Sequence, residues 1–310
     1  MNLLTAKSCI RKNARRILGL FYLLALPACT ESVLFAVNSL ARTDNFAAIE
    51  DIAYGGHRLN RLDVYLPGQG QALRATVVFF YGGCWGGCET RGKEDYPFVA
   101  QALTSRGYAV VIPDYRRYPE VRFGQIIDDA RRSVEWVKAH GAEYGADSGN
   151  IFLMGHSAGA HLGAMLTLNE DYLRPETYQS IRGFVGLAGP YDFLPLTEAY
   201  QKEVFGPEER YPASQPVNFV QGTEPPLLLL YGNNDETVKP INIQSLSNKV
   251  KDAAGCVETH LYDELDHIDL LAALALPLQD NEPVLPDIVE FLDYYAQRQA
   301  SCKSLLTNIH

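Results

Sequence analysis

The sequence Gly155-His156-Ser157-Ala158-Gly159 decides the fold of the chain, because this Gly-x-Ser-x-Gly motif lies between two segments of different pattern. The run at 150–154 is apolar after its first residue, and the run at 160–166 is helix-forming. A buried strand, a sharp turn and a helix are therefore predicted in that order. Glycine at both ends of the turn removes the Cβ atoms that would collide where strand and helix nearly touch. The hydroxyl of Ser157 is then left exposed as a nucleophile.

The rest of the chain alternates strand and helix patterns. The runs Asp51–Tyr54 and Leu62–Leu66 alternate apolar and polar residues and are joined through Gly55-Gly56, as in a half-buried antiparallel hairpin. Apolar runs typical of parallel strands, or shorter strand patterns, are found at 75–80, 108–112, 184–187, 227–231 and 259–262. Helices are expected at 97–105, 126–140, 241–253 and 284–298, and the run at 268–275 is helix-like. The order predicts one doubly wound α/β domain with a mostly parallel sheet, an N-terminal antiparallel hairpin and no full cap domain.

The N-terminal segment differs from the rest in composition. Five basic residues and no acidic residue precede the apolar stretch Ile17–Ala28, which is the layout of an export signal. The stretch ends in Leu-Pro-Ala-Cys and resembles the lipobox of bacterial lipoproteins, so Cys29 is predicted to carry lipid; plain secretion and an uncleaved anchor are the alternatives. We expect a lipoprotein-type signal peptide at 1–28, a tether at 29–46, a catalytic domain at 47–300 and a C-terminal tail at 301–310. The protein would be exported to the periplasm or the envelope.

Composition restricts the partners. The 310 residues are 47% hydrophobic and 21% charged, as in a globular protein with a sizeable core. Removing a signal with five basic residues takes the formal charge of the chain from −10 to −15. No basic patch remains, so a nucleic-acid partner is not expected, and the membrane would be reached only through a lipidated Cys29. The oligomeric state is not fixed by the sequence.

Four cysteines remain after the N-terminal segment, and in an oxidising compartment they allow two disulfides. Cys84 with Cys88 would be a local pair in a glycine-rich loop, and Cys256 with Cys302 would join a late strand to the C-terminal tail. Free buried thiols are the alternative. A metal site is not expected, because the cysteines lack a second closely spaced ligand pair or a nearby histidine pair. No other cofactor is called for.

A serine nucleophile needs a histidine to take its proton, and in the α/β-hydrolase arrangement that histidine follows the last strand. His267 occupies this position, whereas His260 lies inside the strand pattern and His310 ends the chain. His161, one turn along the nucleophile helix, is expected to orient or cap rather than to catalyse. His267 is therefore predicted to be the base.

The carboxylate that orients the base should follow the preceding strand. Asp235 is in this place, directly after the apolar run 227–231. Three other acids lie nearby in the sequence and are interpreted as loop residues: Glu236, Asp266 and Asp192.

Backbone N–H groups are needed for the oxyanion that forms when serine attacks a carbonyl. One is predicted to come from Ala158, directly after the nucleophile. The others should come from the loop after the strand at 75–80, which reads Tyr-Gly-Gly-Cys-Trp-Gly-Gly-Cys at 81–88. Repeated glycine lets the main chain turn its N–H groups toward a ligand.

The motif Gly-His-Ser-Ala-Gly-Ala-His-Leu, the Gly-Gly-x-Trp loop and the sequence Pro-Asp-Tyr-Arg at 113–116 together carry a family resemblance. From about Asp51 to Leu292 the chain resembles bacterial α/β-hydrolase carboxylesterases of the hormone-sensitive-lipase, kynurenine-formamidase and feruloyl-esterase-like group. The resemblance implies that Gly83 and Cys84 supply the loop amides beside Ala158. Tyr81 stands where that group usually has histidine, so the anchoring hydrogen bonds of the loop should differ.

These parts predict a serine carboxylic-ester hydrolase that forms an acyl-enzyme and acts on a small-molecule ester. The segment Gly189–Pro226 is rich in Tyr and Pro and is expected to form a wall or partial lid, in which Tyr191 would contact the substrate together with Trp85. Such aromatic residues favour small or aromatic acyl groups, although an ordinary core would use them equally. The alternatives are an arylformamidase, a polysaccharide deacetylase with the same triad, or a catalytically silent envelope binding module.

Overall fold

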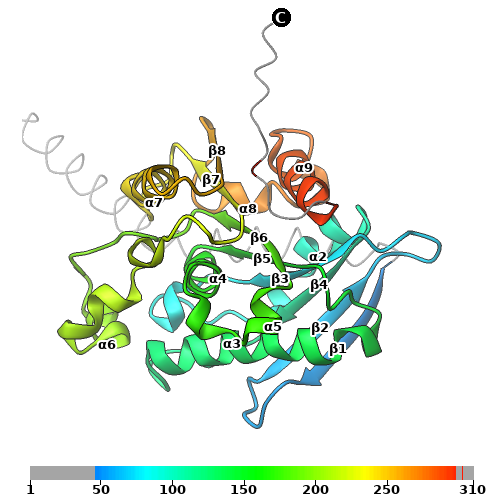
Figure 1. The fold of residues 1–310 in the computed structure, drawn as a ribbon, viewed down its shortest axis with the longest axis horizontal. Coiled ribbons are helices and arrows are strands. Elements are labelled where there is room, and N and C mark those ends of the chain that lie inside the picture. Colours follow the sequence, from blue (N-terminus) through cyan, green and yellow to red (C-terminus); the bar gives the residue numbers. More distant parts are fainter. Residues whose placement is uncertain (1–45, 298–301, 303–310) are drawn as a thin grey trace, which may run out of the picture.

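The structure is a computed structural model and describes residues 46–297 and residue 302. Its centre is an eight-stranded sheet with the order β1-β2-β4-β3-β5-β6-β7-β8 (Figure 1). The pairs β1–β2 and β2–β4 are antiparallel, and all other neighbours are parallel. The α/β-hydrolase fold with an N-terminal antiparallel pair is therefore confirmed.

The element bounds agree closely with the sequence patterns. The strands are β1 (Ala47–Ala53), β2 (Arg61–Leu66), β3 (Ala75–Phe80), β4 (Tyr108–Pro113), β5 (Ile151–His156), β6 (Ile181–Leu187), β7 (Leu227–Gly232) and β8 (Val257–Tyr262). The helices are α2 (Pro97–Thr104), α3 (Phe123–His140), α4 (Ala158–Leu168), α5 (Pro175–Tyr178), α6 (Ala199–Phe205), α7 (Ile241–Asp252), α8 (Asp269–Ala272) and α9 (Val284–Ala296).

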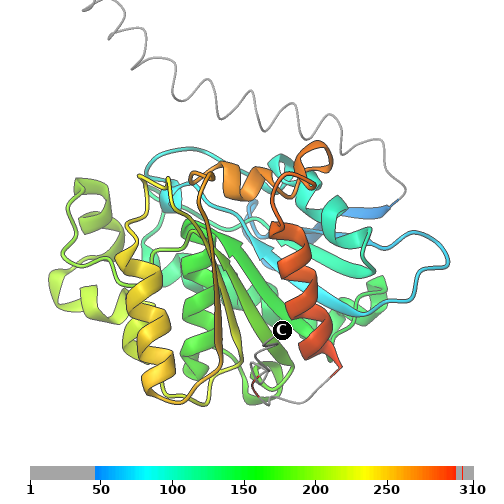
Figure 2. The same cartoon turned by 90° about the horizontal axis from the view of Figure 1, so that it is seen from above.

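Helices cover both faces of the sheet. Figures 1 and 2 show α3, α4 and α7 on one face and α2 and α9 on the other. Every residue of β3, β4, β5 and β7 is buried, which explains why these strands are continuous apolar runs rather than alternating ones. Sequences of this kind are stable only between two layers of helices, because both faces of the strand must leave water.

Two elements differ from the sequence prediction. Strand β1 is not half-buried: all of its residues except Ile52 are exposed, and its pairing with β2 is interrupted by a register shift between Ile49 and Ile52. The helix expected at 268–275 is a single turn, α8, followed by a short 3₁₀ segment at Leu276–Leu278. The two are separated at Ala275, whose backbone is extended with φ −75° and ψ 138°.

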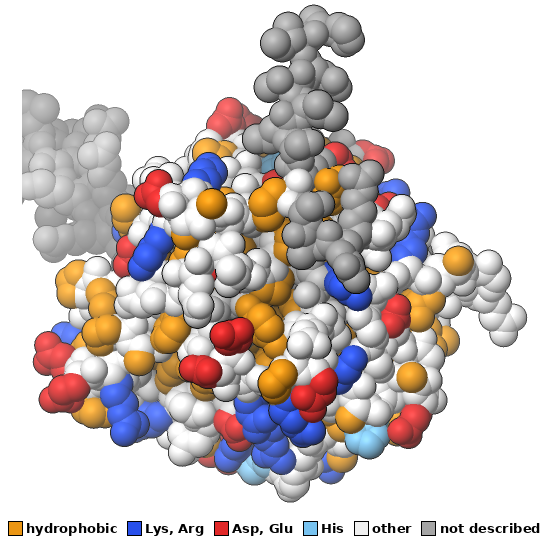
Figure 3. All heavy atoms as spheres, in the orientation of Figure 1, with side chains coloured by type: hydrophobic (Ala, Val, Ile, Leu, Met, Phe, Trp, Pro, Cys, Tyr) orange, Lys and Arg blue, Asp and Glu red, His pale blue; other side chains and the backbone are white. Residues whose placement is uncertain are grey.

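The surface is mixed in charge on the face drawn in Figure 3, where acidic side chains border the group of basic side chains at the lower edge. Within the described residues, no helix has the length and apolar character needed to cross a membrane. The predicted signal peptide, Cys29 and the tether up to residue 45 lie outside the described residues, as does the tail apart from Cys302.

The start of α4 lies very close to the neighbouring strands. A Cβ atom on Gly159 would lie 2.0 Å from the carbonyl oxygen of Phe80 at the end of β3. A Cβ atom on Gly155 would lie 2.4 Å from the carbonyl carbon of Gly159. Both distances are far shorter than any real carbon contact, so the prediction that these glycines prevent a collision is confirmed.

We expect Gly159→Ala to lower the free energy of unfolding by more than about 3 kcal/mol, because the methyl group meets rigid backbone that cannot move aside. Urea denaturation followed by circular dichroism measures this change. Gly124→Ala in α3 is the matched control: its Cβ would meet nothing within 4 Å, so it should be neutral or stabilise by up to about 1 kcal/mol. Equal stability of the two variants would contradict the steric explanation.

Candidate active site

Ser157 lies in the sharp turn between β5 and α4 with φ 54° and ψ −123°. A residue with a side chain adopts a positive φ only where the surrounding structure enforces it. Here the backbone N–H of Ser157 donates to the carbonyl of Leu187 at 2.9 Å, and its own carbonyl accepts from the N–H of His161 at 3.1 Å. The turn is therefore held from both sides at the carboxyl edge of the sheet.

Asp235 and His267 come together beside this turn, from the loops after β7 and β8. His267 Nδ1 lies 2.7 Å from Asp235 Oδ2, and the Asp235 side chain is fully buried. The other carboxylate oxygen accepts the backbone N–H groups of Thr237 at 2.8 Å and Val238 at 2.9 Å. These bonds fix the carboxylate so that it accepts the Nδ1 proton, which leaves Nε2 of His267 as the basic nitrogen.

The competing acids make other contacts. Asp266 accepts the N–H groups of Ile268 and Asp269 and so caps the start of α8. Asp192 accepts the hydroxyl of Ser245, and Glu236 is exposed. Of the four acids that the sequence offered, Asp235 is the one hydrogen-bonded to His267.

His156 is a neighbour of the site that the sequence analysis passed over because it precedes the serine. Its Nε2 donates to the backbone carbonyl of His267 at 2.9 Å, and the two rings lie 4.7 Å apart. It therefore ties the last residue of β5 to the loop that carries His267. Burial, together with the nearby His267, lowers the pKa of His156 to about 3.

The glycine-rich loop after β3 lies against the nucleophile. A Cβ atom on Gly82 would be 3.1 Å from Cβ of Ser157, so this glycine allows the loop to approach. Gly83, Cys84 and Trp85 follow with φ of 111°, 54° and 56°. The N–H groups of Gly83, Cys84 and Ala158 take no part in the turn and loop hydrogen bonds found among the described residues.

The loop is anchored through Tyr81, which replaces the histidine of the resembling family. Its hydroxyl donates to Asp114 Oδ1 at 2.7 Å, and its carbonyl accepts from the Tyr115 hydroxyl at 2.6 Å. The Tyr81 ring is stacked between Tyr96 and Tyr115, with ring centroids 5.3 and 4.8 Å away. The Pro-Asp-Tyr-Arg motif after β4 thus supplies two of the partners that hold the loop.

The two disulfides that the sequence allows are present, Cys84–Cys88 within the glycine-rich loop and Cys256–Cys302 between the residue before β8 and the last residue that the structure describes. The alternative of free thiols is therefore wrong. The described residues contain no group of three or more His, Cys, Asp or Glu side chains arranged to hold a metal ion.

The two aromatic residues predicted to contact substrate are both buried. Trp85 is 4% exposed and packs on Phe193 and Phe205 of the segment 189–226. Tyr191 is 1% exposed, packs edge-on against Phe184 and reaches the backbone of Gly186 in β6. The structure thus places Tyr191 in the core beneath the segment rather than on an open wall, because small residues in β6 leave space for its ring.

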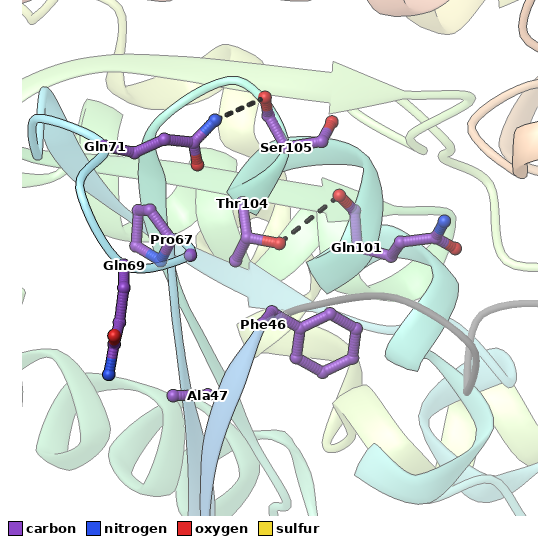
Figure 4. Close-up of a pocket in the computed structure, with 9 residues that line it drawn as sticks. Phe46, Ala47, Pro67, Gln69, Gln71, Gln101, Thr104 and Ser105 are labelled. Carbon is purple, nitrogen blue, oxygen red and sulfur yellow. Dashed lines mark hydrogen bonds between the residues drawn. The ribbon is translucent and has the colours of Figure 1, made fainter.

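A large cavity lies away from this site. It has a volume of about 790 Å³ and lies at the opposite edge of the sheet, where the parallel strands begin (Figure 4). It is lined by Phe46, Ala47, Pro67, Gly68, Gln69, Gln71, Gln101, Thr104 and Ser105. The residues around Ser157 all lie at the carboxyl edge, so this cavity does not serve them.

The fold, with a serine in a strained turn and an acid and a histidine in loops after the next strands, is that of an α/β hydrolase. A family model described as BD-FAE matches residues 62–250, and the chain belongs to this family.

Relatives of known name are similar over most or half of the chain. The isoprenylcysteine alpha-carbonyl methylesterase ICME of Arabidopsis thaliana is 28% identical over 261 residues, 76% of this chain and 60% of that protein. The esterase LipQ of Mycobacterium tuberculosis is 30% identical over 284 residues, 84% and 66% of the two chains. The kynurenine formamidase of Danio rerio is 34% identical over 153 residues, which are 49% of this chain and 50% of that protein. The chain spans about half to two thirds of the length of the curated relatives it matches.

Solved esterase structures have the same fold. Esterase B from Lactobacillus rhamnosis with a tributyrin phosphonate inhibitor superposes with a TM-score of 0.72 at 19% identity, covering 88% of this chain and 95% of that one. At this identity the likeness shows the fold alone.

Two buried histidines make the free energy of unfolding depend on pH. Burial lowers the pKa of His156 to about 3 and of His161 to about 4, from 6.5. Between pH 4 and 6.5 the unfolded chain thus binds protons that the folded chain does not, so stability falls as the pH falls. Each histidine contributes up to about 1.4 kcal/mol per pH unit.

We expect His156→Gln to reduce the slope of the unfolding free energy against pH by about 1 kcal/mol per pH unit between pH 5 and 6, because glutamine does not titrate. Urea denaturation at several pH values measures the slope. His57→Gln is the control, because His57 is half-exposed and pairs with Glu120 at the surface. An unchanged slope in the His156 variant would show that this side chain is protonated in the folded protein.

Proposed function

We propose that this chain hydrolyses carboxylic esters through an acyl-enzyme formed on Ser157. The observation that carries the proposal is the hydrogen bond between His267 and the buried Asp235 beside the strained serine turn. The BD-FAE match and the relatives named as esterases support the same reaction.

The mechanism assigns each group one task. Nε2 of His267 takes the hydroxyl proton of Ser157 while the serine oxygen bonds to the ester carbonyl carbon. The negative charge on the carbonyl oxygen is met by N–H groups of Gly83, Cys84 and Ala158. The proton then passes to the departing alcohol, the acyl-enzyme remains, and water deprotonated by His267 releases the acid.

Asp235 has the supporting task. Its carboxylate stabilises the imidazolium that forms in both halves of the reaction and keeps Nδ1 as the protonated nitrogen. Its second oxygen is occupied by two backbone N–H groups, so the side chain cannot turn away from His267.

For the substrate we propose esters with small or aromatic acyl groups. The segment 189–226 forms only α6, two 3₁₀ turns and loops, which is too little to build a closed acyl tunnel. Its rings at Phe193 and Phe205 pack onto Trp85 beside the oxyanion loop, which makes this side of the site aromatic. An arylformamide is the second candidate, favoured by the similarity to a kynurenine formamidase.

We also propose that the protein is exported, with Cys29 lipidated. Two disulfides among the described residues support an oxidising compartment. The mass of the mature N-terminal peptide tests this proposal: it should begin at Cys29 and carry the added mass of the lipid.

Ser157→Ala should abolish both ester hydrolysis and labelling by a fluorophosphonate probe, because it removes the oxygen that forms the covalent bond. Asp235→Asn should lower kcat by about 10³- to 10⁴-fold, because the amide favours the wrong histidine tautomer. Steady-state kinetics with p-nitrophenyl acetate measures both. Asp266→Asn, which keeps the cap on α8, is the matched control and should stay within about threefold of wild type. Persistent labelling of the Ser157 variant would refute the nucleophile.

A substrate series distinguishes the candidates. We expect kcat/KM for p-nitrophenyl esters to be highest for acetyl, butyryl and aromatic acyl groups, and at least about tenfold lower for acyl chains of eight carbons or more. A higher kcat/KM for an aryl formamide than for every ester would favour the formamidase. Release of acetate from acetylated xylan at a comparable rate would favour the deacetylase.

A further inference from the structure

His161 is a fully buried polar side chain for which the mechanism above has no use. It lies in α4, and its backbone N–H donates to the carbonyl of Ser157 at 3.1 Å. Its side chain has no exposed surface, yet both ring nitrogens are hydrogen-bonded. Nδ1 accepts the indole N–H of Trp85 at 3.1 Å, and Nε2 donates to the carbonyl of Ser214 at 2.7 Å.

The two partners of His161 belong to separate parts of the site. Trp85 follows Cys84 in the glycine-rich loop, and Ser214 ends the 3₁₀ helix Glu208–Ser214 within the segment 189–226. His161 itself belongs to the helix whose first residue is Ala158. One imidazole ring therefore connects the nucleophile helix, the loop and the segment that packs over them.

We propose that His161 is a positioning residue that sets the two halves of the oxyanion hole in register, by holding Trp85 through its indole N–H. This inference rests on the proposed function. One half of the hole, Ala158, is three residues from His161 in the same rigid helix. The other half, Gly83 and Cys84, directly precedes the tryptophan that His161 holds.

Tyr81 and the Cys84–Cys88 disulfide also hold the loop, and its backbone conformation favours a further support at Trp85. Cys84 and Trp85 both have positive φ, which costs about 1–2 kcal/mol for each residue with a side chain. The ring of Trp85 packs on Phe193 and Phe205, and the bond from its indole N–H adds a polar contact to this packing. A hydrogen bond is directional, and its loss would leave a buried N–H without a partner.

The bond also requires one tautomer of the histidine. The indole can only donate, so Nδ1 must be free of a proton and Nε2 must carry it. The carbonyl of Ser214 selects this tautomer, because it can only accept. Burial lowers the pKa of His161 to about 4, which keeps the ring neutral at pH 7.

A histidine that only fills space in the core would respond differently to replacement. Its replacement would lower stability but leave the chemistry of the folded protein unchanged. A positioning role instead lowers kcat and weakens binding of a tetrahedral adduct, whereas KM changes little because the oxyanion hole serves acylation and deacylation alike.

The experiment compares His161→Leu, His161→Gln and Trp85→Phe in the full chain, with p-nitrophenyl acetate as substrate and an aryl trifluoromethyl ketone as transition-state analogue. We expect His161→Leu and Trp85→Phe to lower kcat by about 10- to 100-fold, with KM within about threefold and the inhibition constant raised in parallel with the loss of kcat. His161→Gln should recover most of the activity, because its amide can accept from the indole and donate to Ser214. The double variant with His161→Leu and Trp85→Phe should lose no more kcat than the less active of these two single variants.

Phe291→Leu is the control for stability, because Phe291 in α9 packs on Phe152 near the start of β5, away from the site. It should lower the melting temperature without changing kcat. Unchanged kcat in both His161→Leu and Trp85→Phe would overturn the inference, and if the histidine variant does not fold, the tryptophan variant decides. A wild-type protein that neither hydrolyses esters nor reacts with the fluorophosphonate overturns the proposed function itself.

Discussion

The approach of α4 to the sheet is the constraint on which the rest of the structure depends. Gly159 lies so close to the carbonyl of Phe80 that no side chain fits between them. Ser157, with its positive φ, directly precedes this helix, and the first N–H groups of α4 have no partner within the helix. The parallel pairing of β3 with β5 places the end of β3 beside the end of β5, so the glycine-rich loop begins where the serine lies. A more distant helix would separate the two sources of oxyanion donors.

The remaining groups of the site depend on sheet topology. The parallel order β5-β6-β7-β8 places the loops of Ser157, Asp235 and His267 at one edge, although these residues are far apart in the sequence. Backbone contacts then refine the arrangement: His156 holds the loop of His267, and two N–H groups hold the carboxylate of Asp235. Backbone groups therefore supply most of the contacts that position Asp235 and His267.

The sequence predicted the buried strands and the acid and histidine loops well, because continuous apolar runs and chain order are local signals. It predicted the glycine collisions for the same reason. It did not reveal the contacts of His156, or those between His161, Trp85 and Ser214, because these pairs lie far apart in the chain and no pattern links them. Tyr191 was expected to face substrate, but the space left by Gly186 in β6 draws its ring into the core. Whether an aromatic residue in a loop is buried thus depends on where the neighbouring strand has glycine in place of a larger residue.

The irregular edge strand β1 affects the tendency of the protein to aggregate. An exposed edge strand offers unpaired backbone groups to which another chain can add, which is a route to aggregation. In β1 the regular ladder breaks at Asp51, whose φ is 58°. The backbone N–H of Asp51 turns inward to Asp63 at 2.8 Å, and its side chain binds Lys93 at 2.9 Å. A bulge fixed by two buried partners thus shortens the stretch on which a second strand could align, and it protects the sheet at the β1 edge.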